Sequence, residues 1–108
     1  MAKQFCKMTF EPTEMVLNYD SGKGRKDLML SYDQIISISI DKCTVRKFFK
    51  TIETERVGVT PRQFGVAINY YAYKEGPFFQ GYKDGLRKFA KENRISIYDS
   101  LKEQDGVK

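Results

Sequence analysis

The chain has 108 residues, of which 41% are hydrophobic and 31% are charged, a composition that fits one globular domain with a single core and no stabilising disulfides. No apolar run approaches the roughly 20 residues of a transmembrane helix, and the first residues lack the apolar segment of a signal peptide, so we expect a cytoplasmic protein. The absence of histidine removes the commonest general base and the commonest zinc ligand, while the formal charge of +5 allows an anionic partner without requiring one.

The first third of the chain is typical of three short strands. Residues 5–10, 14–20 and 27–32 each alternate apolar and polar side chains, which is the period of two expected of a half-buried strand. Pro12 lies in a predicted turn, because proline cannot donate a hydrogen bond to a strand ladder. The polar, glycine-containing segment 20–26 predicts a flexible loop between the second and third strands.

The middle of the chain predicts three further strands. In residues 35–41, every second residue from Ile36 is an isoleucine, and β-branched residues at this density favour a strand over a helix. We expect a turn at residues 41–42 and a fifth strand at residues 43–50. Residues 53–59 have the pattern of a weak, exposed sixth strand.

The next segment predicts the longest strand and then the principal helix. After a turn at residues 60–63, residues 64–73 alternate throughout and predict the seventh strand. A helix over residues 77–94 follows, with Gly85 marking close packing of this helix on a strand. One apolar stripe recurs at helical spacing: Phe79, Tyr82, Leu86, Phe89 and Ala90.

The C-terminal end is expected to add little to the core. Residues 95–98 are predicted to dock as an extended segment, and residues 102–108 to form a flexible tail. The whole chain, 1–108, is therefore predicted to be one domain with a core at about residues 4–98.

Seven short strands followed by one C-terminal helix resemble the pleckstrin-homology (PH) superfold. Residues 28–38 look like the strand, tight turn and strand of bacterial PH-like families, and residues 79–89 are similar to their closing helix. The resemblance implies a mainly β fold, a seven-stranded PH-like barrel or sandwich capped by an α-helix at about residues 77–94. It also implies a non-catalytic interaction domain.

Phosphoinositide binding is not carried over by this resemblance. Family members that bind inositol lipids hold the phosphates with basic residues in the first strand-to-strand loop. The corresponding segment here, residues 11–14, contains Glu11 and Glu14, which repel phosphate.

The second loop is the better candidate for an anion site. Its glycines let backbone N–H groups approach a ligand, and Lys23, Arg25 and Lys26 attract phosphate. A solvated hairpin loop explains the same residues, so both interpretations stay open. The segment is not a P-loop, because the required spacing and a following helix are missing.

Residues 42–50 interleave cations with aromatic residues, as do surfaces that hold single-stranded nucleic acid. Arg46 and Lys50 share a strand face with Phe48, whereas Phe49 points to the opposite face and is predicted to lie in the core. An edge strand that its charges protect from aggregation also explains this pattern.

An aromatic cluster around the end of the seventh strand is a candidate protein interface. Tyr70 and Phe79 are expected in the core under the helix. If Tyr71, Tyr73 and Phe78 stay exposed, they mark a protein-binding or self-association patch, because exposed aromatic residues are enriched in interfaces.

No residues carry a catalytic or cofactor signature. Glu53 and Glu55 share a strand face, but neither a nucleophile nor a metal ligand accompanies them. Cys6 and Cys43 lack ligand spacing and are expected to be small buried hydrophobic residues, with a disulfide or a redox role as the alternative. We therefore expect no catalytic residue, no cofactor and no metal.

The sequence favours a non-enzymatic, cytoplasmic, PH-like domain that binds another protein or a second copy of itself, by strand addition or by packing. The alternative is electrostatic binding of anionic lipid head groups or nucleic acid through loop 22–26 and strand 42–50. The residues predicted for that alternative are Lys23, Arg25, Lys26, Arg46 and Lys50.

Overall fold

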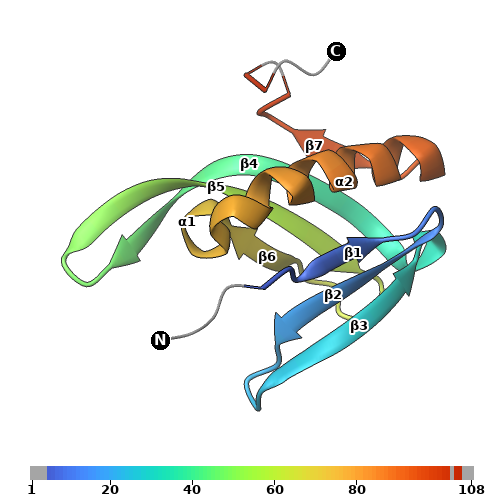
Figure 1. Cartoon of the computed structure of the whole chain (residues 1–108), viewed down its shortest axis with the longest axis horizontal. Coiled ribbons are helices and arrows are strands. Elements are labelled where there is room, and N and C mark those ends of the chain that lie inside the picture. Colours follow the sequence, from blue (N-terminus) through green and yellow to red (C-terminus); the bar gives the residue numbers. More distant parts are fainter. Residues whose placement is uncertain (1–4, 103, 106–108) are drawn as a thin grey trace.

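The computed structural model describes residues 5–102, 104 and 105 of the chain (Figure 1). These residues form a mainly β fold with two sheets, as predicted. The first sheet has the order β1 (Met8–Phe10), β2 (Glu14–Asp20), β3 (Arg25–Ser31). The second sheet has the order β6 (Ile68–Tyr71), β5 (Lys50–Pro61), β4 (Ile35–Lys47), β7 (Ile97–Asp99). The helical elements are η1 (Tyr32–Gln34), α1 (Ala72–Glu75), η2 (Gly76–Phe78) and α2 (Phe79–Asn93).

The two sheets face each other as a sandwich and are not closed into a barrel (Figure 1). Helix α2 contacts β1 of the first sheet and β4 of the second. It therefore covers the open side of the sandwich between these two strands. Six of the seven strands in the described residues precede α2 and one follows it. The predicted order, with all seven strands ahead of the helix, was therefore wrong in this respect.

The first sheet follows the alternation that the sequence predicts. Strand β2 has the predicted bounds, and the side chains of Met15 and Leu17 are fully buried together with Leu30 of β3. The turn that contains Pro12 is closed by a hydrogen bond from the Glu11 N–H to the Glu14 carbonyl. These strands pack their apolar face against the second sheet and the helix.

Strands β4 and β5 form one long hairpin, in place of the three shorter strands that the sequence predicts. The expected turn at residues 41–42 is absent from this hairpin, because the pairing runs unbroken through Asp41 and Arg56. Their side chains form a two-pronged ion pair across the strands, with Nη2 of Arg56 2.8 Å from the Asp41 carboxylate. Residues 53–59, expected to be exposed, instead lie in a central strand with Val57 and Val59 fully buried.

Two local irregularities change which side chains face the core. The pairing of β4 with β5 shifts register between Ile35 and Ser37, so Ile35 is buried and Ile36 is 45% exposed. The predicted strand 64–73 shrinks to β6, because Pro61 accepts hydrogen bonds from the N–H groups of Phe64 and Gly65 and closes a turn. Gly65 has φ of 71°, which glycine adopts without strain.

Helix α2 buries the predicted stripe. Phe79, Tyr82, Leu86 and Phe89 are all buried, together with Ala90. Gly85 lies so close to β1 that a Cβ atom there would overlap the ring of Phe10. The helix can approach the first sheet this closely only because residue 85 has no side chain.

The segment after α2 contributes more than predicted. Strand β7 pairs in parallel with β4, and Leu101 beyond it is 1% exposed, so the packed region extends past residue 98. Asp105 lies 3.0 Å from Nζ of Lys83 and 2.7 Å from Nη2 of Arg87, and Arg87 also pairs with Asp99. The remainder of the predicted tail, residues 103 and 106–108, lies outside the described residues.

None of the described helices combines the length and the apolar composition that crossing a bilayer requires.

Candidate functional site

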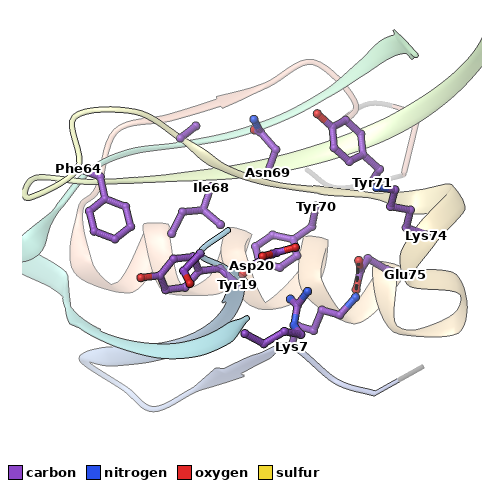
Figure 2. A pocket seen from close by; sticks show the side chains of 13 residues that line it. Lys7, Tyr19, Asp20, Phe64, Ile68, Asn69, Tyr70, Tyr71, Lys74 and Glu75 are labelled. Carbon is purple, nitrogen blue, oxygen red and sulfur yellow. Dashed lines mark hydrogen bonds and ion pairs between the residues drawn. The ribbon is translucent and has the colours of Figure 1, made fainter. Parts of the chain in front are cut away.

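A cleft of about 490 Å³ opens between the two sheets at one end of the sandwich (Figure 2). One wall comes from β6 and the turn before it, the opposite wall from the end of β2 and the start of β3, and one end from α1. The residues along the cleft are Lys7, Tyr19, Asp20, Ser21, Arg25, Phe64, Ala67, Ile68, Asn69, Tyr70, Tyr71, Lys74 and Glu75.

The cleft borders the edge of β6 and not only one face of it. Ile68 and Tyr70 point toward the opposite wall, whereas Asn69 and Tyr71 point away from it (Figure 2). All four line the cleft, and so does Ala67. Because side chains from both faces of β6 take part, the wall is formed by the backbone edge of the strand. Within the described residues β6 pairs with β5 alone, so its other edge has no strand neighbour.

The deep end of the cleft is a polar cluster around Glu75. This carboxylate is only 5% exposed; its Oε2 lies 3.0 Å from Nζ of Lys7, and its Oε1 accepts a hydrogen bond of 3.4 Å from the hydroxyl of Tyr82. The Tyr82 oxygen in turn accepts a 2.7 Å hydrogen bond from the backbone N–H of Lys7. Burial raises the pKa of Tyr82 to about 12, against the opposing effect of that N–H group.

Tyr70 ties the two sheets together at the floor of the cleft. Its hydroxyl donates a 2.9 Å hydrogen bond to the backbone carbonyl of Asn18 in β2, and its ring meets the ring of Tyr82 edge to face. Burial also raises the pKa of Tyr70 above its ordinary value. Both tyrosine hydroxyls are therefore engaged in hydrogen bonds, and these contacts hold the two sheets together at this part of the cleft.

The mouth of the cleft is aromatic and carries a positive excess. The rings of Tyr19 and Phe64 meet edge to face across it, with centroids 5.7 Å apart. Arg25 is held in place by hydrogen bonds to the side chain and the backbone carbonyl of Asn18. Three cationic side chains and two carboxylates line the cleft, and one carboxylate is already paired within it.

A second surface of interest is the tip of the β4–β5 hairpin. Lys47 and Lys50 are the last paired residues, so Phe48 and Phe49 form a two-residue turn. Phe49 is 100% exposed and Phe48 is 87% exposed. The prediction that Phe49 lies in the core was wrong, because the strand ends before it and leaves no sheet face on which to pack.

The basic residues predicted for an anion site are divided between two corners of the molecule. Lys23 is exposed in the β2–β3 turn and Arg25 and Lys26 begin β3, whereas Arg46 and Lys50 flank the β4–β5 tip, which projects elsewhere (Figure 1). They therefore do not form one combined site.

Two backbone N–H groups of the β2–β3 turn are already hydrogen-bonded within the turn. The N–H groups of Gly22 and Lys23 donate to side-chain oxygens of Asp20 and Ser21, at 2.8 and 3.4 Å. An anion would have to displace these contacts to use the backbone of the turn. Of the three basic residues predicted in this loop, the structure brings only Arg25 to the cleft.

Two of the three predicted interface residues, Tyr71 and Tyr73, lie together, and Phe78 does not join them as an exposed ring. Tyr71 lines the cleft, and its ring lies 6.1 Å from that of Tyr73. Nζ of Lys47 lies over the Tyr73 ring at 5.5 Å, which connects Tyr73 with the β4–β5 hairpin. Phe78 is half-buried against the core, so it offers less surface than the sequence suggests.

Sequence reasoning missed the polar centre of the cleft. Lys7 and Glu75 lie 68 residues apart in the chain, and no pattern in the sequence connects them. Tyr82 was predicted as a member of the apolar stripe, and nothing in its spacing indicates a role for its hydroxyl. The contact exists only after the two sheets come together.

The remaining chemistry is sparse. Both cysteines are free thiols; Cys6 is exposed, against the expectation of burial, and Cys43 is half-buried. Cys6 belongs to the segment before β1, where no partner strand covers it, and its Sγ donates to the Met8 carbonyl. In the part of the chain that the structure describes, no group of three or more acidic or cysteine side chains is placed to hold a metal ion.

Comparisons identify no relative of this chain. No family model matches it, and neither curated proteins nor solved structures give a significant match. Membership of the PH-like family therefore stays a prediction.

Proposed function

We propose that this protein is a non-catalytic, cytoplasmic interaction domain of the PH-like type that binds an extended segment of another protein as an additional strand beside β6. The observation that carries the proposal is the cleft that runs along the unpaired edge of β6. A sheet edge offers backbone N–H and C=O groups to a new strand, which supply affinity for any extended chain. The cleft places this edge opposite a second wall that side chains of the guest can contact.

The dimensions favour a short guest strand. Strand β6 has four residues, which at the usual rise correspond to about 13 Å of extended chain. Alternate side chains of the guest would meet the aromatic mouth at Tyr19 and Phe64 or point to solvent. Recognition of this kind reads every second residue of the guest.

The charges favour an acidic guest. Lys7, Arg25 and Lys74 outnumber Asp20 and Glu75 along the cleft, and the whole chain carries a positive excess. Glu75 and Lys7 offset each other through their ion pair. The other charges along the cleft are two cations and one carboxylate, an excess that favours carboxylates on a passing strand.

The same contacts argue for binding in place of catalysis. The buried hydroxyls of Tyr70 and Tyr82 and the carboxylate of Glu75 are engaged with one another or with neighbouring backbone groups. Such a network rigidifies a site, whereas an acid or base must exchange a proton with a substrate.

The proposal is tested by nuclear magnetic resonance on the isotopically labelled protein with two capped peptides, one alternating valine with glutamate and one alternating valine with lysine. The glutamate peptide should shift the amide signals of Ile68–Tyr71 and slow their hydrogen exchange. The lysine peptide should bind with an affinity at least about tenfold lower, because it reverses the charge of the guest.

A matched pair of variants tests whether the peptide binds in the cleft. Ala67→Glu adds a carboxylate at the cleft and should abolish the response to the glutamate peptide, whereas Gln63→Glu adds the same charge in the exposed turn outside it and should not. The proposal is wrong if the glutamate peptide leaves the β6 amide signals unchanged. Concentration-dependent shifts of these signals without peptide would identify a second copy of the chain as the occupant and would also contradict it.

A further inference from the structure

The β4–β5 hairpin extends beyond the rest of its sheet as an arm. Strand β7 covers β4 only at residues 38–40, and β6 pairs with β5 only from Arg56 onward. From the pair Lys42 and Glu55 to the pair Lys47 and Lys50, the two strands therefore have no other strand neighbour in the described structure. These five steps correspond to an arm of about 17 Å. Figure 1 shows the tip of this hairpin extending past the other strands of both sheets.

The turn at the tip of this arm consists of two phenylalanines, which are not the residues that favour a tight turn. A two-residue hairpin turn is formed most easily by asparagine and glycine, which tolerate positive φ. Here Phe48 has φ of 56°, a conformation that is costly for a bulky side chain, and its ring and that of Phe49 lie in solvent. Local strain combined with full exposure of two apolar rings indicates a contact outside the chain.

The charges around the tip define the kind of contact. Between Asp41 and Glu53 the chain has four basic residues and no acidic one. These basic residues lie in the arm and are exposed: Lys42, Arg46, Lys47 and Lys50. A surface that receives this arm must therefore be anionic, and it must accept two apolar rings ahead of the cations.

We propose that the β4–β5 arm docks on an anionic phospholipid bilayer, with Phe48 and Phe49 entering the boundary between head groups and acyl chains. The flanking cations would then lie at the level of the lipid phosphates, where basic residues gain most from the negative surface potential. A groove that binds single-stranded nucleic acid would instead need rings spread along a basic track. In this arm both phenylalanines lie in the terminal turn, where they can enter a bilayer ahead of the flanking cations.

A tryptophan at the tip provides a direct test, because the chain contains no tryptophan. In Phe49→Trp the only indole lies at the fully exposed position. With phosphatidylcholine vesicles that contain phosphatidylserine, its emission should shift to shorter wavelength and be quenched by brominated acyl chains. With vesicles of phosphatidylcholine alone, neither change should occur at the same lipid concentration.

Sedimentation with the same vesicles separates the two contributions. Phe49→Ser should weaken binding about tenfold or more, and Lys50→Glu should weaken it by a similar factor. The matched controls are Tyr98→Ser, another exposed aromatic residue, and Lys23→Glu, the same charge reversal in the β2–β3 turn; both should bind as the parent chain does.

Three results would overturn the proposal. The first is an unshifted indole on phosphatidylserine vesicles. The second is binding that Lys50→Glu abolishes and Phe49→Ser leaves intact, since this indicates surface attraction without entry into the bilayer. The third is loss of binding in Lys23→Glu equal to that in Lys50→Glu, which would mean that net charge and not the arm directs the protein to lipid.

Discussion

The ammonium of Lys7 lies 3.0 Å from the carboxylate of Glu75, although 68 residues separate them in the chain. This contact joins the segment before β1 to the end of α1 and closes the deep end of the cleft. It also fixes the hydroxyl of Tyr82, which contacts both residues. The shape of the candidate site therefore depends on a pairing between the two ends of the strand-rich region.

Replacing the buried carboxylate tests this dependence. Glu75→Gln keeps the shape but leaves the ammonium of Lys7 without its countercharge, so the free energy of unfolding should fall by about 1–3 kcal/mol. Urea denaturation measures the loss. Glu92→Gln, at an exposed position of α2, is the matched control and should change stability by less than about 0.5 kcal/mol. Equal effects of the two substitutions would contradict a structural role for the ion pair.

Alkaline pH should destabilise the fold through Tyr82. Its pKa is raised from the ordinary value of 10.0 to about 12, so the folded protein keeps a proton that the unfolded chain releases. This contribution to stability is fully present below pH 10 and is lost as the pH rises through the folded-state pKa. Thermal unfolding at increasing pH should show the decline, and Tyr82→Phe should reduce its slope. A slope unchanged by Tyr82→Phe would assign the alkaline loss to another group.

Acid should loosen the segment after β7 through Asp105. Burial opposes ionisation of this carboxyl, but hydrogen bonds from Arg87 and Lys83 outweigh it and lower its pKa below the ordinary 3.8. Its contribution to stability is therefore present above about pH 4 and is lost as the pH falls through the lowered pKa. At neutral pH, Asp105→Asn should cost about 1–2 kcal/mol and speed hydrogen exchange in β7.

The control for Asp105 is Asp84, which is exposed on α2 and accepts a hydrogen bond from Gln80. Asp84→Asn should cost only a few tenths of a kcal/mol, roughly the value of a surface helix pair. Exchange in β7 that is the same in both variants would show that Asp105 does not hold the segment.

Two glycines of α2 should respond to alanine in opposite directions. Alanine favours a helix over glycine by up to about 1 kcal/mol, and a Cβ at Gly81 meets no atom within 4 Å, so Gly81→Ala should stabilise the protein. A Cβ at Gly85 would overlap the Phe10 ring, so Gly85→Ala should destabilise it despite the same gain in propensity. Calorimetric unfolding temperatures compare the two variants. A rise in both would mean that the helix can move away from β1 at little cost.

Elements with a complete local pattern were predictable from sequence. Strand β2 has the expected bounds because its alternation is uninterrupted, and α2 buries its stripe because the apolar spacing matches one face of a helix. The hairpin of β4 and β5 was split in the prediction because Asp41 and Lys42 have the composition of a turn. The partner that holds Asp41 in a strand, Arg56, lies on the neighbouring strand and is invisible to a local window.

The candidate site was less accessible to sequence reasoning. Arg25 was predicted for an anion site and Tyr71 for a protein interface, and nothing in the sequence places the two along one cleft. Phe49 was assigned to the core because a strand through residue 50 would turn it to the face opposite Phe48, and only the bounds of β4 and β5 show that the strand ends before it. Burial of an apolar side chain can be predicted from its neighbours in the sequence. The composition of a site depends on which distant segments come into contact in the fold.

Among the described residues, β7 is the last strand in chain order, yet it covers an edge of β4 about sixty residues earlier in the sequence. A nascent chain that has not yet released residues 97–99 therefore presents an unpaired strand edge to its surroundings. Shortened chains that end before residue 97 should associate more readily and engage chaperones more than a chain that includes β7.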